Sequence, residues 1–373
     1  MPPSRILDSH IHLWPSTSTA STDHGWMTDP AHFLARRHGI SDYKAVVSAA
    51  PAGPSLSGFV YVETDRYLPS RTPDISPEAS EDQTKRALEK WAKAPLDELR
   101  FLRRIVEESP HEGDGFERGD GDKMKGAVVW APFHLAPSLL QSYLAIAESV
   151  AGEKLWGRIA GFRYLLQGKE KGEVTKLVGS DDWVKNIAGL GKGRQGKGWA
   201  FDVGVDIHRD GPEPLGAVGE MIRRVREQEA ESGAETKPVR FVLNHLCKHA
   251  LASDSQTEPT KEWQAALAAL GPDQNVFMKL SGAFNEFDSA TPSTAADLVH
   301  SLSSIVPKVF EAFPERVMFG SDWPVCNVGG PAGEEANWGV WVESVERLLE
   351  EAKVGGESRD SVWWGAGSRA YGV

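Results

Sequence analysis

Residues 5–12 read RILDSHIH, a short apolar segment that ends in two histidines, His10 and His12, placed two positions apart. In an extended strand, residues two apart point to the same face, so both imidazoles can reach one point. An open doubly wound sheet that binds a nucleotide would be expected to have a glycine-rich phosphate loop after its first strand. Here the first strand runs into His-Ile-His instead, which favours a closed barrel over an open sheet.

Seven further apolar, β-branched segments follow the first one at intervals along the whole chain. They are residues 58–63 (GFVYVE), 126–131 (GAVVWA), 161–165 (GFRYL), 199–205 (WAFDVGV), 239–245 (VRFVLNH), 276–281 (VFMKLS) and 316–321 (RVMFGS). Several are continuous apolar runs, as expected of strands buried on both faces of a parallel sheet. Helix-like stretches lie between them, at 138–150, 214–226, 263–270, 295–313 and 337–352. This alternation predicts an α/β fold, a (β/α)8 TIM barrel.

The length of 373 residues suits one large barrel, because such barrels routinely exceed the usual domain size. We expect one domain over residues 1–373, with an insertion at about 69–125 that has a Pro/Ser-rich entry, an amphipathic helix near 83–106 and a Gly/Asp-rich exit. The pattern of this insertion leaves three roles open: a lid, a segment packed under the barrel, or a contact with a second subunit.

The charge balance argues against several classes of partner. The formal net charge is −12, which disfavours nucleic acid and anionic membrane surfaces as main partners. No apolar run approaches the roughly 18 residues of a membrane span, and the N-terminus shows no secretory pattern. Cys247 and Cys326 form no metal-type or disulfide framework. We therefore expect a cytoplasmic protein that acts on a small molecule, and a homo-oligomer stays open.

In a barrel of this type the chemistry lies at the carboxyl ends of the strands. His245 ends the run VRFVLNH, and Asp322 follows the run RVMFGS. A carboxylate directly after a buried strand must be paired, bound to a metal or solvated in a cleft. Taken alone, His245 could equally be a buried core residue, and Asp322 could equally cap a loop, without any role in a reaction. Together with His10 and His12 they supply nitrogen and oxygen ligands suited to zinc or manganese, so we expect one reaction centre.

Seven motifs together resemble the amidohydrolase superfamily, in the group that contains sugar-acid lactonases and the pyrone dicarboxylate lactonase. They are DSHIHLW, GFVYVE, GAVVWAPF, GFRYLLQ, VRFVLNHLCKH, VFMKLSG and RVMFGSDWPV, in order from about residue 6 to about residue 325. The resemblance implies that His10, His12, His245 and Asp322 hold one divalent metal, zinc or manganese. It also implies that Asp322 and His245 are catalytic, with Asp322 accepting a proton from the attacking water.

The chain departs from binuclear members of this superfamily at the end of the fourth strand. Where those members carry a bridging lysine, this chain has Arg163 and Tyr164. One metal or none is therefore expected, and Arg163 would match a substrate-anchoring arginine. The alternatives are a structural salt bridge at the strand end for Arg163 and structural pairing at the barrel top for Glu63. His208 falls just past the fifth strand, as a fifth ligand, a substrate contact or an ordinary loop histidine. The full set of expected substrate contacts is Arg163, Tyr164, Trp14, Trp130, Glu63, His208, Lys248 and Trp323.

The resemblance implies a hydrolase that opens a sugar-acid lactone, an L-rhamnono- or related aldono-lactone. Two alternatives within the superfamily stay open: a metal-dependent non-oxidative decarboxylase, and a lactonase that works without metal while it keeps the same histidines. A binding protein without activity would be expected to have lost part of the reaction centre, and none of the four residues is missing.

Overall fold

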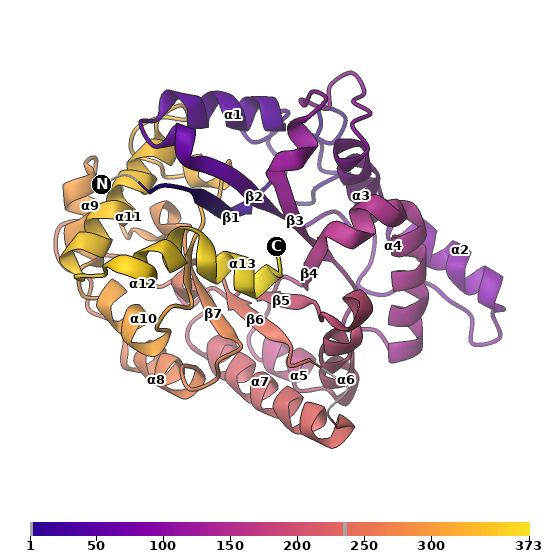
Figure 1. The fold of residues 1–373 in the computed structure, drawn as a ribbon. Helices are drawn as coiled ribbons and strands as arrows, with labels where there is room; N and C mark the ends of the chain where they lie inside the picture. The colour runs from indigo at the N-terminus through magenta and orange to yellow at the C-terminus, as the bar shows by residue number, and fades with distance from the viewer. Residues whose placement is uncertain (1–2, 234–236) are drawn as a thin grey trace.

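The computed structural model describes residues 3–233 and 237–373. Within these ranges, eight parallel strands form one sheet in the order of the chain, β1 to β8 (Figure 1). The strands are β1 (Ile6–Ile11), β2 (Leu56–Val62), β3 (Met124–Trp130), β4 (Ile159–Arg163), β5 (Ala200–Val203), β6 (Arg240–Leu243), β7 (Val276–Leu280) and β8 (Val317–Phe319). Each overlaps the segment predicted for it, and the (β/α)8 barrel is confirmed.

The barrel closes between the segment after β8 and the end of β1. The backbone N–H of Asp322 donates to the carbonyl of His10 at 2.9 Å, and that of His12 donates to the carbonyl of Trp323 at 2.8 Å. Parallel pairing joins Ile11 to Trp323. These bonds hold the loop that carries Asp322 against the strand end that carries the two histidines.

Helices surround the sheet (Figure 1). They are α1 (Ile40–Ala49), α2 (Glu81–Trp91), α3 (Lys93–Val106), α4 (Pro137–Arg158), α5 (Glu173–Val178), α6 (Asp181–Gly189), α7 (Glu213–Ser232), α8 (Lys261–Leu270), α9 (Ala295–Leu302), α10 (Val306–Ala312), α11 (Asn337–Glu351), α12 (Gly356–Asp360) and α13 (Ala366–Tyr371). In the described ranges, none of them has the length and apolar character needed to cross a bilayer.

Two helix-like stretches of the sequence are each divided in the structure. Residues 295–313 form α9 and α10, because Pro307 lacks an N–H and begins a new helix rather than continuing one. The amphipathic stretch near 83–106 forms α2 and α3, which meet at Ala92. In both cases each of the two helices buries apolar side chains.

The insertion at 69–125 supplies α2 and α3, which pack beside α4 on the outside of the barrel. From α3, the buried carboxylate of Glu98 accepts hydrogen bonds from the hydroxyl of Tyr61 (2.7 Å) and from the N–H and hydroxyl of Thr64 (3.1 and 2.8 Å). The insertion therefore supports the carboxyl end of β2. The assignment of the whole chain to one domain stays a prediction.

The C-terminal helix α13 lies across the opening of the barrel (Figure 1), and its apolar side chains pack against a buried cluster of strand residues. Ala366, Ala370 and Tyr371 join a buried cluster with Leu7 and Val242. The hydroxyl of Tyr371 donates to Oδ1 of Asp202 at 2.8 Å. The chain end thus fills the barrel beneath the strand ends that carry the candidate site.

Candidate active site

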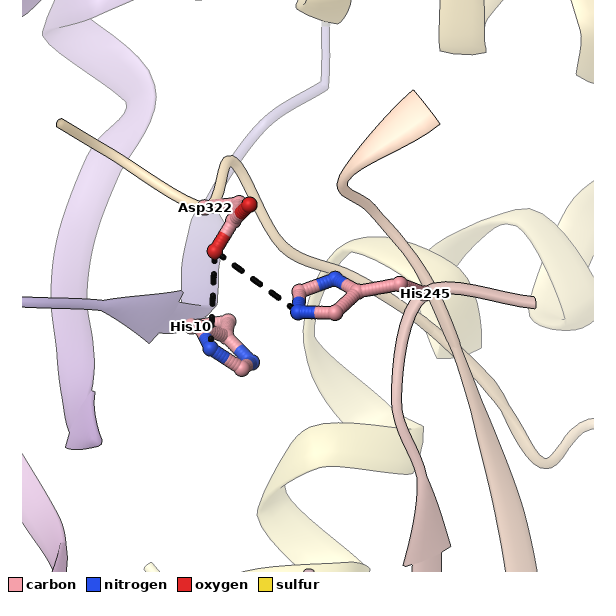
Figure 2. Close-up of side chains that lie close together, drawn as sticks. All are labelled: His10, His245 and Asp322. Atoms are coloured by element: carbon pink, nitrogen blue, oxygen red, sulfur yellow. Dashed lines mark ion pairs between the residues drawn. The ribbon is translucent and has the colours of Figure 1, made fainter. Parts of the chain in front are cut away.

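Four side chains from three parts of the barrel converge at its carboxyl end. Oδ1 of Asp322 lies 3.6 Å from Nε2 of His10, 3.4 Å from Nε2 of His12 and 3.7 Å from Nε2 of His245. The Nε2 atoms of His10 and His12 are 3.2 Å apart. Figure 2 shows His10, His245 and Asp322 pointing toward one another from β1, from the segment after β6 and from the loop after β8.

These separations match the spacing of ligand atoms around one metal ion. With Zn–N and Zn–O bonds of about 2.0–2.1 Å, tetrahedral ligands lie roughly 3.3 Å apart. Ligand atoms of His10, His245 and Asp322 all lie within 4.8 Å of one another, and all three residues are buried. The donor set of His10, His245 and Asp322 therefore fits a divalent ion such as zinc, and Nε2 of His12 lies beside this set, 3.4 Å from Oδ1 of Asp322.

Two of the histidines are oriented as metal ligands usually are. Nδ1 of His12 lies 2.8 Å from the carbonyl oxygen of Val62, so Nδ1 carries the proton and Nε2 presents a lone pair. Nδ1 of His245 lies 2.8 Å from the hydroxyl oxygen of Ser281, which can accept in the same way. Both rings therefore point a free Nε2 toward Asp322.

The third histidine has a different neighbour. Nδ1 of His10 lies 3.0 Å from Nζ of Lys279, which also donates to Oδ2 of Asp202 at 2.7 Å. For His10 to present a lone pair at Nε2, its Nδ1–H must donate to a neutral lysine amine. Burial lowers the pKa of Lys279, and the carboxylate of Asp202 opposes this.

The electrostatics of the site favour an ionised Asp322 and neutral His10 and His245. Burial raises the pKa of Asp322, but the imidazoles of His245 and His12 outweigh it and the net pKa is lowered. Burial lowers the pKa of His245 to about 3, against the opposing charge of Asp322. Burial and the charge of Lys279 also lower the pKa of His10 well below its usual value. An ionised carboxylate among neutral imidazoles suits both metal binding and proton acceptance.

The segment after β6 holds His245 in a strained backbone turn. His245, Leu246, Cys247 and Lys248 all have positive φ, at 54°, 54°, 59° and 52°. A left-handed conformation costs roughly 1–2 kcal/mol for each residue with a side chain. Such strain persists only where the surrounding structure imposes it, and it clusters at functional sites. Here the turn places both His245 and Lys248 at the edge of a cavity.

The cavity next to the four residues has a volume of about 240 Å³. Pockets for drug-sized ligands are larger, at roughly 300–1,000 Å³, so this one suits a ligand the size of a monosaccharide. Of the residues expected from sequence, six line it: His12, Trp14, Arg163, His245, Lys248 and Asp322. The structure therefore brings the reaction centre together with three of the expected substrate contacts.

Arg163 lines the cavity but is already paired. Its Nε donates to Oε1 of Glu63, and its Nη2 donates to the carbonyl oxygen of Glu63 at 2.5 Å. The two side chains are 7% and 1% exposed. Arg163 and Glu63 form one buried ion pair, which is the structural alternative left open for each of them. The guanidinium is fixed in place and largely neutralised before any ligand binds.

Four other expected contacts lie outside the lining of this cavity in the described ranges. Tyr164 packs against Trp183 and His134. Trp130 packs against Trp91 and Tyr143. Trp323 packs against His38 and Tyr43. His208 lies one step further out, with Nδ1 3.0 Å from Oε2 of Glu286.

Several lining residues were not among the residues that sequence singled out as substrate contacts. Trp26 and Asp65 line the outer part, where Trp26 is 38% exposed and Asp65 is exposed. Asn244 and Glu286 line the buried part. The sequence offers one signal for Glu286: it is a polar residue in the loop after a predicted strand, in the run SGAFNE after β7.

The fold and the site define the class: a parallel eight-stranded barrel with a histidine–aspartate centre at its carboxyl end. The family model described as amidohydrolase matches residues 216–351. An L-fucono-1,5-lactonase of Burkholderia multivorans is 31% identical over 230 residues, which cover 61% of this chain and 67% of that protein. The chain belongs to the amidohydrolase family, and the resemblance seen in its motifs is confirmed.

Two further comparisons extend over nearly the whole chain. An L-rhamnono-gamma-lactonase of Scheffersomyces stipitis is 24% identical over 384 residues, with 99% of each chain covered. The crystal structure of a Burkholderia multivorans amidohydrolase with bound zinc has a TM-score of 0.63 at 23% identity, with 99% of each chain covered. The structural likeness confirms the fold from end to end.

Proposed function

We propose that this protein is a lactonase that hydrolyses a sugar-acid lactone, an L-rhamnono- or related aldono-lactone, to the open acid. The observation that carries the proposal is the convergence of His10, His12, His245 and Asp322 on one point beside a monosaccharide-sized cavity. Relatives named for two sugar-acid lactones, one over nearly the whole chain, support this substrate class.

In the proposed reaction, Asp322 takes a proton from a water molecule as its oxygen attacks the lactone carbonyl carbon. The acyl bond to the ring oxygen then breaks, and the proton passes from Asp322 to that oxygen, which becomes the hydroxyl of the product. Lys248 lines the cavity, with Nζ 3.8 Å from Oδ2 of Asp206, and is placed to stabilise the negative charge on the carbonyl oxygen.

We assign one divalent metal, zinc or manganese, to His10, His12, His245 and Asp322. When bound, such an ion polarises the carbonyl and lowers the pKa of the attacking water. The contact between Nζ of Lys279 and Nδ1 of His10 bears on the metal-free alternative. A charged Lys279 would donate to Nδ1, which leaves the proton of His10 on Nε2, and a protonated Nε2 cannot bind a metal. The cytoplasmic location and a homo-oligomer stay predictions.

The deciding experiment combines elemental analysis of freshly purified protein with hydrolysis of a sugar-lactone panel, followed by a pH indicator, before and after chelation. About one metal per chain and chelator-sensitive hydrolysis would support the full proposal. Hydrolysis without metal would keep the lactonase and change His10 and His12 into groups that polarise the substrate. Metal without any lactone hydrolysis would overturn the lactonase and make decarboxylation the next reaction to test.

A further inference from the structure

One buried carboxylate in the cavity has an oxygen without a partner. Glu286 ends the short turn after β7, and its side chain is 2% exposed. Oε2 accepts hydrogen bonds from Nη1 of Arg209 (2.9 Å) and from Nδ1 of His208 (3.0 Å). Oε1 has no hydrogen-bond partner in the described part of the chain. Hydrogen bonds thus fix Oε2 of the carboxylate, and Oε1 remains available as an acceptor.

A second polar side chain of the same cavity is also unsatisfied. Asn244 immediately precedes His245 and is 1% exposed. Neither Oδ1 nor Nδ2 of its amide finds a partner among the described residues. A buried donor or acceptor without a partner is destabilising, so such groups are rare in folded proteins and call for an explanation. Both residues line the cavity, so a bound ligand can supply what the protein lacks.

The charges around the cavity define what kind of ligand this is. Asp65, Glu286 and Asp322 all line it. The positive charge of Arg163 is already taken by Glu63, and Lys248 lies 3.8 Å from Asp206. A substrate carboxylate beside the unpartnered Oε1 of Glu286 would place two acceptor oxygens of like charge against each other. A neutral ligand with several hydroxyl groups would instead donate hydrogen bonds to these acidic groups.

We infer that Glu286 accepts a hydrogen bond from a hydroxyl of the lactone and that Asn244 pairs with a second polar group of it, so that the cavity selects neutral polyhydroxylated lactones. This inference rests on the proposed function and names its substrate class. Glu286 is a specificity residue in this account, because it contacts the substrate away from the carbonyl that reacts. A lactone without hydroxyl groups leaves Oε1 of Glu286 without a hydrogen-bond donor. A lactone with a carboxylate is repelled by this oxygen.

The test compares Glu286→Gln with the unmodified protein on two neutral lactones, L-rhamnono-lactone and unsubstituted δ-valerolactone. In the glutamine side chain, an NH2 group replaces either the free acceptor oxygen or the oxygen that accepts from Arg209 and His208. We expect kcat/KM for the hydroxylated lactone to fall about 10- to 100-fold, mostly through KM, with less than about a twofold change for δ-valerolactone. Asp288→Asn is the matched control: Asp288 lies 3.4 Å from His208 but is 66% exposed, so both rates should stay unchanged.

An equal fall on both lactones would overturn the role of Glu286 and leave the proposed hydrolysis standing. Because Glu286→Gln also alters the contacts with Arg209 and His208, the unmodified protein supplies an independent measurement. It should prefer L-rhamnono-lactone over δ-valerolactone and over a carboxylated lactone at least about 100-fold, and no preference would overturn the inference. If no lactone is hydrolysed at all, the proposed function fails. In that case the inference is tested by calorimetry with L-rhamnono-lactam, an analogue that is not hydrolysed. The unmodified protein should bind this lactam, and Glu286→Gln should weaken the affinity at least about tenfold. Equal affinity of the two proteins would overturn the inference.

Discussion

Gly282 lies directly against the imidazole ring of His245: a Cβ atom at position 282 would stand 2.5 Å from Nδ1 and 2.6 Å from Cγ of that ring. Gly282 also has a φ of +64°, which residues with a side chain rarely adopt. Gly282→Ala should push the ring away from Asp322 and from Ser281. We expect kcat/KM for the lactone substrate to fall at least about tenfold, because small displacements of catalytic groups are costly.

Gly168→Ala is the matched control for this change. Gly168 has a φ of +67°, and a Cβ there would meet no atom within 4 Å. Backbone strain should therefore cost both variants a similar amount of stability, about 1 kcal/mol, and the contact with His245 adds a further loss in Gly282→Ala alone. Only Gly282→Ala should lose activity. Equal activities of the two variants would show that the packing of Gly282 against His245 does not position the ring.

Asp322→Asn should abolish turnover while the protein stays folded. The amide keeps the shape of the side chain but cannot accept the proton of the attacking water, and it is a poor metal ligand. We expect kcat to fall about 10²- to 10⁴-fold. Steady-state kinetics give the activity, circular dichroism the fold, and elemental analysis the metal content. Turnover within a few-fold of the unmodified protein would remove Asp322 from the mechanism.

The fold could be predicted from the sequence because eight short, largely apolar segments recur along the chain, and the strands β1 to β8 that they form are buried on both faces over most of their length. The reaction centre could be predicted for a related reason. His10, His12, His245 and Asp322 lie at or just beyond strand ends, and in a closed parallel barrel those ends meet at one place.

The rest of the site depends on side-chain directions and on loops, which strand periodicity does not specify. Tyr164 follows Arg163 directly, so it points to the opposite face and packs among outer aromatic rings. The pairing of Arg163 with Glu63 joins residues 100 positions apart, across the intervening strand β3. Glu286 lies in a loop turn beyond β7, where no repeating pattern marks the residues that face the cavity.

Replacing Arg163 should cost stability as well as substrate binding. Arg163→Met leaves the carboxylate of Glu63 buried and unpaired, and such a loss costs about 3–5 kcal/mol of unfolding free energy. The double variant Arg163→Met with Glu63→Gln should regain part of this loss. Chemical denaturation measures both. Arg36→Met is the control, because its pair with Glu334 is solvent-exposed and contributes at most about 1 kcal/mol. If both single variants lose the same free energy, Arg163 is not held in a buried pair.

Acid should destabilise the protein through its buried neutral histidines. Burial lowers the pKa of His24 to about 2 and that of His38 to about 4, while an unfolded histidine has a pKa of about 6.5. Below pH 6.5 the unfolded chain therefore binds protons that the folded chain does not. The free energy of unfolding must then fall as pH falls, by up to about 1.4 kcal/mol per pH unit for each such histidine.

His24→Gln isolates one of these contributions. His24 is fully buried, with Nε2 2.8 Å from Oγ1 of Thr64, and a glutamine amide can keep that hydrogen bond. Between pH 6 and pH 5, the unfolding free energy of the variant should fall less steeply than that of the unmodified protein, by about 1.4 kcal/mol per pH unit. Buried carboxylates such as Glu63 have raised pKa values and act in the opposite sense, but they are common to both proteins and cancel in the comparison. The difference between the two proteins should stop changing above about pH 7.5, where histidine is neutral in both states. Parallel pH profiles below pH 6 would mean that His24 is protonated in the folded protein.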